Sequence, residues 1–584
     1  MPAILTRPIM SNAVRTLSRV QIRFFSSTSG LLSKKIVIVG GVAGGASAAA
    51  RLRRLDENAT ITVFEKGPFV SFANCGLPYY VGDVIKDDKD LVLATPALFK
   101  NRYKIDVRTQ NEVVKIDTKA KTVEVKDVAK NTTSTESYDA LVLAPGAFPI
   151  RPPLPGIDLP GIFLLRTIPD SMQIRAWMDQ YKIKRAVVVG GGFIGLETAE
   201  NLVHRGIEVT IVEMGTQILP PMDPEMAEIL HEHCKAKGVN LCLGDGVAGF
   251  YKTDTGLEVA TQSGARYPCE VAILGIGVRP ETKLAKEAGL ELGKLGGIKV
   301  DEQMRTSDPN IWAVGDAVEV KDFVTGQMAL VPLAGPANRQ GRIAADAING
   351  RSSTFRGVQG TAVCGVFDKV AASTGASEKT LKRYGIPYEK VYLHPNNHVG
   401  YYPGAKMIHF KLLYSPKDGK ILGAQAIGEA GVEKRIDVVA MAIQQGMTVY
   451  DLEESELCYA PQFGAAKDPV NFAGFIASNS LRGDSPIVHW DAIIKGECDP
   501  NHVLVDVRTK EEINLGMYKG AKHIPIDEMR ARMSELPKDK PIYLYCGVGL
   551  RGYNVVRMLK QNGYQAYNVP GGWKTYAYVS KCVK

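Results

Sequence analysis

The chain has 584 residues, of which 45% are hydrophobic and 23% are charged, and its formal net charge is +9. This length suits roughly four globular domains, and the composition is that of ordinary α/β proteins rather than of disordered or membrane-spanning chains. The modest charge gives no indication of nucleic-acid binding. Nine scattered cysteines without a C-x-x-C pair argue against a disulfide scaffold and against structural zinc.

The first 33 residues are basic, and the first acidic residue of the chain is Asp56. They contain Arg7, Arg15, Arg19 and Arg23. A basic, acid-free stretch that is rich in Ser and Thr and can form an amphipathic helix is typical of a transit peptide. Residues 23–26, Arg-Phe-Phe-Ser, look like a mitochondrial processing site with cleavage after Phe25. We therefore expect residues 1–33 to direct the protein to the mitochondrial matrix; the alternative is a disordered basic tail.

From Lys34 to about Asn349, strand-like runs alternate with helical patterns, as in parallel sheets. In the first unit, Gly40 and Gly45 take the first and third positions of a G-x-G-x-x-G turn. Val42 takes the second position, where backbone usually lies closest to a pyrophosphate, and Glu65 ends the next strand. The helix dipole and the free amides still favour a dinucleotide at this turn.

The second unit has the complete fingerprint. Gly190, Gly192 and Gly195 follow a strand and precede a helix, so that backbone N–H groups can approach a pyrophosphate. Glu213 ends the next strand. A carboxylate there accepts hydrogen bonds from a ribose 2′-hydroxyl and repels a 2′-phosphate, so this unit is predicted to prefer NADH to NADPH.

Cys75 stands alone, ten residues after Glu65, in the run Ser-Phe-Ala-Asn-Cys-Gly-Leu-Pro-Tyr-Tyr of residues 71–80. The next cysteine in the sequence is Cys234. We therefore predict redox chemistry carried by one thiol, which takes its second sulfur from a bound molecule or carries an oxygen itself. Because the thiolate is the reactive form, we expect a lowered pKa for Cys75.

Residues 231–234, His-Glu-His-Cys, resemble a set of metal ligands. On the helix predicted here, their spacing spreads the side chains around the axis. We interpret them as part of a solvated face and predict no metal site.

Two later strands carry a family resemblance. The strand 138–143 ends in a turn of small residues, and the strand 311–314 ends in Gly315-Asp316. With the two glycine turns, this order resembles the pyridine nucleotide–disulfide reductase superfamily. The resemblance implies FAD on the first unit, with Asp316 bonded to its ribityl chain, and NADH on the second. It also implies that nicotinamide and Cys75 lie on opposite faces of the flavin.

The run around Cys75 is similar to that of the coenzyme A–disulfide reductase branch, over nearly all of residues 34–475. The resemblance implies a homodimer in which Tyr459 and one of Tyr401 and Tyr402 reach Cys75 of the partner subunit. It implies coenzyme A contacts from Ser47, Arg51, Arg54, Ser71, Asn74 and Asn338. One lysine that the family uses is replaced by Tyr103 here, which weakens the expected coenzyme A site.

The last segment resembles a single rhodanese domain. Cys546 follows an apolar strand, and Gly547, Gly549 and Gly552 let backbone N–H groups converge on its sulfur, while Arg551 adds positive charge. The C-x4-R loop is shorter than the C-x5-R loop of cysteine phosphatases, which favours sulfur transfer over phosphate chemistry. Gly547 replaces an arginine of the common rhodanese loop, which suggests an acceptor other than that of thiosulfate–cyanide chemistry. The alternative is an inert docking domain.

The sequence thus predicts an α/β protein with two Rossmann-like dinucleotide-binding domains, an α+β dimerisation domain and a C-terminal α/β rhodanese domain. The expected boundaries are 34–150 and 269–350 for the FAD domain, 151–268 for the NADH domain, 355–475 for the dimerisation domain, 476–486 for a linker and 487–584 for the rhodanese domain. The expected function is NADH-driven reduction of coenzyme A disulfide, coenzyme A persulfide or polysulfide, coupled to sulfur transfer at Cys546. The alternatives are an NADH oxidase or peroxidase that uses a Cys75 sulfenic acid, and a redox-gated binding protein.

Overall fold

The computed structural model describes residues 33–254 and 256–583, so the predicted transit peptide falls outside the described residues except for Ser33. The first dinucleotide-binding domain is a parallel five-stranded sheet in the order β19-β7-β1-β2-β3. Its strands are β1 (Lys35–Val39), β2 (Thr60–Glu65), β3 (Asp106–Thr109), β7 (Ala140–Leu143) and β19 (Ile311–Ala313). Every residue of β7 and β19 is buried, as expected for a parallel sheet covered on both faces.

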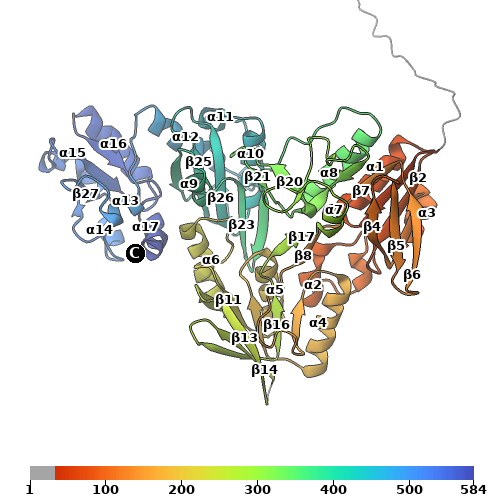
Figure 1. Ribbon diagram of the computed structural model, residues 1–584. Coiled ribbons are helices and arrows are strands. Elements are labelled where there is room, and N and C mark those ends of the chain that lie inside the picture. The colour runs from red at the N-terminus through yellow and green to blue at the C-terminus, as the bar shows by residue number, and fades with distance from the viewer. Residues whose placement is uncertain (1–32, 255, 584) are drawn as a thin grey trace, which may run out of the picture.

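Two helices from distant parts of the chain pack against each other in this domain, α1 (Ala43–Leu55) and α8 (Ala334–Ile348). The other elements are α2 (Leu77–Val81), α3 (Pro96–Tyr103), α7 (Lys283–Glu287) and an antiparallel sheet of β4 (Asn111–Asp117), β5 (Thr122–Asp127) and β6 (Thr132–Ser137). Smaller strands are β8 (Ala147–Pro149), β17 (Val278–Pro280), β18 (Ile298–Lys299), β20 (Val318–Lys321) and β21 (Met328–Ala329). The domain is therefore built from two separate stretches of chain, with the second dinucleotide-binding domain inserted between them (Figure 1).

The inserted domain repeats the plan. Its parallel sheet has the order β12-β11-β10-β16-β9. These strands are β9 (Ile162–Leu164), β10 (Arg185–Val189), β11 (Glu208–Glu213), β12 (Asn240–Leu243) and β16 (Val271–Leu274). Around them lie α4 (Ile168–Tyr181), α5 (Phe193–His204), α6 (Pro224–Ala236) and the antiparallel strands β13 (Val247–Thr253), β14 (Gly256–Thr261) and β15 (Arg266–Cys269). Each glycine turn therefore joins the middle strand of a sheet to a helix.

The third domain is α+β, as predicted. Its antiparallel sheet has the order β22-β23-β26-β25-β24. The strands are β22 (Ala362–Val366), β23 (Lys369–Gly375), β24 (Glu389–Leu393), β25 (Ile408–Tyr414) and β26 (Ile421–Gly428). The helices are α9 (Glu378–Arg383), α10 (Val432–Gln444), α11 (Val449–Glu454) and α12 (Pro469–Leu481). Every residue of β25 and β26 is buried, so both faces of the sheet centre are covered.

The C-terminal domain has a parallel sheet in the order β28-β27-β29-β30. Its elements are β27 (Val503–Asp506), β28 (Lys522–His523), β29 (Ile542–Tyr545), β30 (Ala566–Asn568), α13 (Trp490–Lys495), α14 (Lys510–Ile513), α15 (Met529–Arg532), α16 (Leu550–Gln561) and α17 (Gly572–Cys582). Cys546 follows β29, and α16 begins four residues later, which is the strand–loop–helix arrangement that the sequence predicts.

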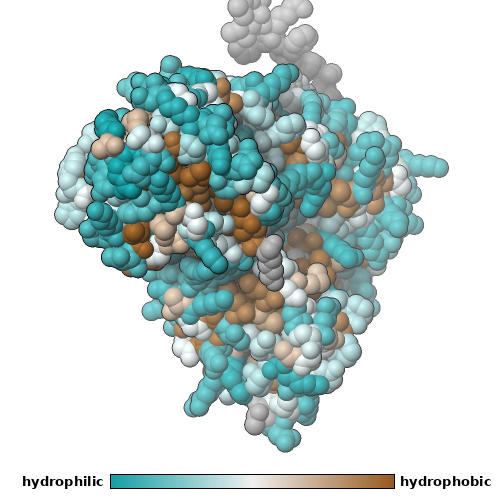
Figure 2. All heavy atoms as spheres, turned by 90° about the vertical axis from the view of Figure 1, so that its left-hand side faces the viewer, coloured by the Kyte–Doolittle hydropathy of each residue, from teal (hydrophilic) through white to brown (hydrophobic). Residues whose placement is uncertain are grey.

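The C-terminal domain docks against two others. It lies beside the dimerisation domain in Figure 1, and α17 packs on α6 of the second dinucleotide-binding domain. Lys390 forms an ion pair with Asp491 at 2.9 Å, and Glu389 pairs with His489 at 2.7 Å. Figure 2 looks onto this side of the molecule and shows a mostly hydrophilic face interrupted by hydrophobic patches. Among the described residues, no helix is long and apolar enough to cross a bilayer.

Candidate active sites

A cavity of about 1950 Å³ lies where the first two domains and the dimerisation domain meet. The first glycine turn (Gly40, Val42) and the second (Gly192) line it, together with Cys75 and Asp316. The six residues predicted to contact coenzyme A also line it: Ser47, Arg51, Arg54, Ser71, Asn74 and Asn338. The fold thus brings into one space the residues that the sequence assigns to two dinucleotides, a thiol and a substrate.

Both glycine turns have the same backbone geometry. Gly40 and Gly190 have φ values of +92° and +105°, which only glycine adopts without strain. A Cβ on Gly45 would lie 1.9 Å from the Gly40 carbonyl oxygen, and one on Gly195 would lie 1.9 Å from that of Gly190. The first and third glycines of each turn are therefore required by the local chain itself, which explains why both units keep them.

The second position of the turn is different, because a Cβ on Gly192 meets nothing within 4 Å. Val42 holds the equivalent place in the first unit, and its side chain lines the cavity. The chain's own packing therefore tolerates a side chain at this position. The free backbone of the turn and the volume beside it fit a dinucleotide in both domains.

The acid that ends the second strand of each unit is tied back to its glycine turn. Glu65 accepts hydrogen bonds from Gly41 N at 2.9 Å and Gly67 N at 2.8 Å. Glu213 accepts from Gly191 N at 2.7 Å and from Gly215 N at 2.6 Å. Each carboxylate is held at the position where a ribose hydroxyl of a bound dinucleotide would donate to it.

Cys75 lies in a short 3-10 turn (Asn74–Gly76) just before α2, with its side chain accessible from the cavity. The protein groups around Cys75 act against the lowered pKa that we expect for this thiol beside a flavin. The cavity walls desolvate the thiol, and the negative charges of Glu197 and Asp316 raise its pKa further, outweighing Arg166. Both acids come from distant segments, so the sequence around Cys75 gives no sign of them.

The predicted coenzyme A residues are partly engaged with each other. Ser47 donates a hydrogen bond to Asn338. Arg51 pairs with Asp346 at 2.7 Å, which offsets its charge. The guanidinium of Arg54 lies 5.9 Å from the ring centre of Tyr103, the residue that replaces the family's lysine. Arg54 forms no ion pair with a described residue, so its positive charge is available to attract a phosphate.

The three predicted tyrosines do not line the Cys75 cavity of their own chain, within the residues that the structure describes. The hydroxyls of Tyr401 and Tyr459 are 3.0 Å apart, and these side chains are 76% and 48% exposed. Tyr402 instead packs edge-on against the ring of His398, with ring centres 5.7 Å apart. The structure therefore joins Tyr401, rather than Tyr402, to Tyr459.

The second thiol site is compact. Cys546 is fully buried, and Gly549 N donates a hydrogen bond to its sulfur at 3.1 Å. Gly549 has φ +106°, and a Cβ on Gly572 would lie 2.2 Å from the Cys546 carbonyl oxygen, so glycine is required on both sides of the loop. Arg551 is bound by both carboxylate oxygens of Glu512, a residue that the sequence analysis did not single out.

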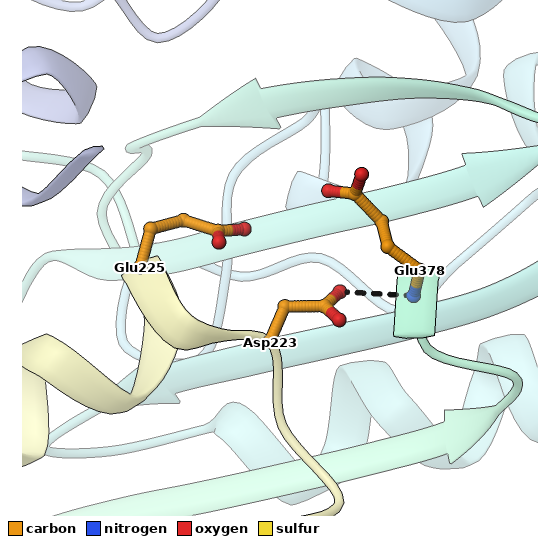
Figure 3. Close-up of side chains that lie close together, drawn as sticks. All are labelled: Asp223, Glu225 and Glu378. Atoms are coloured by element: carbon orange, nitrogen blue, oxygen red, sulfur yellow. Dashed lines mark hydrogen bonds between the residues drawn. The ribbon is translucent and has the colours of Figure 1, made fainter. Parts of the chain in front are cut away.

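Three carboxylates, Asp223, Glu225 and Glu378, lie close enough together to bind a metal ion. Figure 3 shows Asp223 just before α6, Glu225 in α6 and Glu378 in α9, with Asp223 accepting a hydrogen bond from Glu378 N. The ammonium of Lys411, which is fully buried, is 2.8 Å from Asp223 and also pairs with Glu225 and Glu378. A lysine thus fills the position that a cation would take, and we assign no metal here.

The interpretation of residues 231–234 as a solvated face is wrong for two of them. His231 and Cys234 are buried, at 6% and 1% exposure. His231 accepts a hydrogen bond from Ile218 N and pairs with Glu228. The face of the helix that we predicted to be solvent-exposed is covered, because the loop before the helix folds back over His231. These side chains serve packing.

Residues 34–341 match the family model described as pyridine nucleotide-disulphide oxidoreductase, and residues 361–468 match the dimerisation domain of that family. Residues 491–578 match the rhodanese-like domain. The chain therefore belongs to the pyridine nucleotide-disulphide oxidoreductase family and carries a rhodanese-like domain after it. Membership implies flavin and nicotinamide dinucleotide sites, in agreement with the two glycine turns.

Two solved structures match nearly the whole chain, and a further relative matches about three quarters of it. The chain is similar to the reduced CoADR-RHD of Bacillus anthracis, with 49% identity, a TM-score of 0.92, and coverage of 95% of this chain and 99% of that one. It is similar to the NAD-dependent persulfide reductase from A. fulgidus, with 37% identity, a TM-score of 0.86, and coverage of 93% and 100%. It is 36% identical to the coenzyme A disulfide reductase of Staphylococcus haemolyticus over 76% of this chain and 99% of the relative. The resemblance predicted from the sequence is confirmed.

Proposed function

We propose that this protein uses NADH to reduce coenzyme A disulfide, coenzyme A persulfide or polysulfide at Cys75, and that its rhodanese-like domain handles sulfane sulfur at Cys546. One observation carries the proposal: Cys75 is the single cysteine lining the cavity that both glycine turns share, among the described residues. The named activities of the relatives, reduction of coenzyme A disulfide and of persulfide, support it.

The position of each residue in the cavity suggests which ligand it would bind. Gly40, Gly45, Glu65 and Asp316 would hold FAD, and Gly190, Gly192, Gly195 and Glu213 would hold NADH. When bound, FAD supplies the two-electron relay between NADH and the sulfur of Cys75. The Cys75 thiolate attacks the S–S bond of the substrate and forms a mixed disulfide with one half of it. Arg54 and the polar groups beside it orient the coenzyme A phosphates.

The exposed tyrosines support a homodimer with shared sites. Tyr459 and Tyr401 form a hydroxyl pair on the dimerisation domain. A neutral phenol is a proton donor suited to a leaving thiolate. We propose that this pair completes the site of the partner subunit's Cys75.

Substitution of each cysteine tests the two-site proposal. Cys75→Ser should lower NADH-driven reduction of coenzyme A disulfide or persulfide by about a thousandfold or more and leave sulfur transfer unchanged. Cys546→Ala should have the reverse effect. Cys582→Ser, at an exposed cysteine outside the cavity, is the matched control and should change neither. Loss of both activities from either substitution would contradict two independent sites.

The rival within the same class is an NADH oxidase or peroxidase, in which Cys75 cycles through a sulfenic acid. Rates of NADH oxidation with oxygen, peroxide, glutathione disulfide, polysulfide, coenzyme A disulfide and coenzyme A persulfide separate the two. A coenzyme A adduct on Cys75 in the isolated protein, found by mass analysis, supports the reductase. Turnover below about one per minute with every acceptor would instead support a redox-gated binding protein.

We also propose that residues 1–33 act as a mitochondrial leader, on the composition described above. A fluorescent fusion of this segment should localise to mitochondria, and replacement of its four arginines by glutamine should abolish that localisation. Cytosolic fluorescence of the unaltered fusion would overturn the proposal.

A further inference from the structure

The loop that contains Cys546 rests on the first turn of α17. Trp573 N donates a hydrogen bond to the Cys546 carbonyl oxygen at 2.7 Å, and Lys574 N donates to the carbonyl oxygen of Gly547 at 3.0 Å. Because peptide bonds are planar, these two contacts fix the orientation of the first two peptide units of the loop. The loop that presents Gly549 N to the sulfur therefore depends on where α17 begins.

The dimerisation domain holds the beginning of α17 in place. Thr575, the fourth residue of α17, is buried, and its Oγ1 lies 2.8 Å from Nε2 of His394, the residue directly after β24. A Cβ on Gly571, just before α17, would lie 1.9 Å from Thr575 Oγ1 and 2.8 Å from Tyr392 Cβ. Side chains from two domains thus enclose the backbone from which α17 starts.

A second imidazole fixes His394. Its Nδ1 lies 3.0 Å from Nδ1 of His409, whose ring packs edge-on against Tyr578 of α17 with ring centres 5.5 Å apart. Burial lowers the pKa of His394 well below its ordinary value and that of His409 to about 4, so both rings are neutral near pH 7. A neutral imidazole has one N–H donor and one acceptor nitrogen. Whichever ring donates across the pair, Nε2 of His394 keeps a role that the Thr575 hydroxyl can complement.

The same turn of α17 is held from α13 as well. His489 and Asp491 each pair with a residue of the dimerisation domain, at 2.7 Å and 2.9 Å. Trp490 lies between them, is buried, and donates a hydrogen bond from Nε1 to the Gly572 carbonyl oxygen at 2.8 Å. Two sets of contacts therefore connect the dimerisation domain with the turn that supports the Cys546 loop.

We propose that the dimerisation domain holds the Cys546 loop in its sulfur-transfer conformation, with His394 and Thr575 as the positioning residues. This inference rests on the proposed handling of sulfane sulfur at Cys546. The two residues are 181 positions apart in the chain and act through α17. The chemistry at Cys75 and at Cys546 stays separate, but the rhodanese-like site is completed only when its domain is docked.

Rates of sulfur transfer in the full-length, FAD-loaded protein test the proposal. Thr575→Val removes the hydroxyl, keeps nearly the same shape and leaves Nε2 of His394 without its partner. The kcat for thiocyanate formation from thiosulfate and cyanide should fall roughly fivefold or more. Thr575→Ser keeps the hydroxyl and should retain most of the rate. NADH-driven reduction at Cys75 should be unchanged in both proteins.

Substitution in the other domain tests the coupling. His394→Phe should produce the same fall in sulfur transfer, and the double variant should fall no further than either single variant, because both remove one bond. Lys581→Met is the matched control, since it removes a docking pair with Glu232 near the far end of α17. It should leave sulfur transfer unchanged. Independent, additive losses from His394→Phe and Thr575→Val would overturn the proposal.

Hydrogen–deuterium exchange gives a readout that needs no turnover. A peptide covering residues 545–552 should exchange roughly fivefold faster in Thr575→Val and in His394→Phe, while residues 503–506 of β27 keep their rate. Unchanged exchange in the loop, or equally faster exchange in β27, would overturn a local positioning role. Failure of the proposed function is distinguishable, because the unaltered protein would then transfer no sulfur although the loop still responded to both substitutions.

Discussion

Arg551 donates two hydrogen bonds of 2.6 Å to the carboxylate of Glu512 beside the loop that holds Cys546. Hydrogen bonding to Arg551, against the effect of burial, lowers the pKa of Glu512 to about 2. The pair therefore stays ionised, and the arginine charge is offset, throughout the neutral range. Exposed Leu515, Val548 and Leu550 lie within three residues of this pair in the sequence. Such a site attracts small anions poorly.

Glu512→Gln should therefore raise thiosulfate–cyanide sulfur transfer at Cys546 by roughly tenfold, because the freed Arg551 charge attracts thiosulfate. The assay is thiocyanate formation at several thiosulfate concentrations, and the gain should be in kcat/KM. Glu511→Gln is the matched control, since Glu511 is adjacent but does not bond Arg551. Equal rates in all three proteins would show that the pair does not set anion selectivity.

Mixed dimers test the sharing of sites between subunits. As homodimers, both the Cys75→Ser and the Tyr459→Phe proteins should have reduced disulfide reductase activity. The Tyr459→Phe homodimer should lose about tenfold or more. A mixed dimer combines the intact Cys75 of one chain with the intact Tyr459 of the other, so about half the normal activity should return. Tyr402→Phe should behave like the unaltered protein, because its ring packs on His398. If Tyr459 served its own chain, mixing would restore nothing.

Local spacing explains what the sequence could predict. Gly40, Gly45 and Glu65 are fixed by one turn and the strand beside it, so their pattern survives in any chain that builds this unit. The same holds for Cys546 and its glycine loop. These features need no knowledge of how the domains pack.

Contacts between distant segments explain what the sequence could not predict. Glu197 and Asp316 belong to elements far from Cys75 in the sequence, and their charges raise the pKa of its thiol. The loop containing Ile218 covers His231, which turns an expected solvated face into a packed one. Glu512 reaches Arg551 across 39 residues and offsets a charge that looks free in the sequence.

Glu213 should control the choice between NADH and NADPH. Its carboxylate is held by Gly191 N and Gly215 N at the end of β11, where it would repel a 2′-phosphate. In Glu213→Ser the ratio of kcat/KM for NADH to that for NADPH should fall by roughly 10- to 100-fold. Glu208→Ser, at an exposed position on the same strand, should keep the ratio. A ratio that stays constant in Glu213→Ser would place nucleotide discrimination elsewhere.

Removal of the Lys411 ammonium should lower the free energy of unfolding by an amount that depends on pH. Burial lowers the pKa of Lys411, but the charges of Asp223 and Glu225 outweigh it and raise this pKa well above its ordinary value. Burial raises the pKa of Glu378, but the charges of Lys411 and Lys390 outweigh it and lower this pKa. The lysine contribution is complete below its unfolded pKa of ~10.4, and the glutamate contribution is complete above ~4.3. The network thus stabilises the fold between roughly pH 5 and pH 10.

Lys411→Met leaves buried carboxylates without their cation and should cost about 3–5 kcal/mol near pH 7. Its stability should then rise as the pH falls from 7 to 5, because the unpaired acids take up protons on folding, whereas the unaltered protein should hold constant over that interval. Urea midpoints measured across this range give the comparison. Lys299→Met removes an exposed pair with Glu291 and should change stability by less than ~1 kcal/mol at any pH. Parallel pH profiles for Lys411→Met and the unaltered protein would mean that the carboxylates find another cation, and that the Lys411 ammonium is not what joins the second dinucleotide-binding domain to the dimerisation domain.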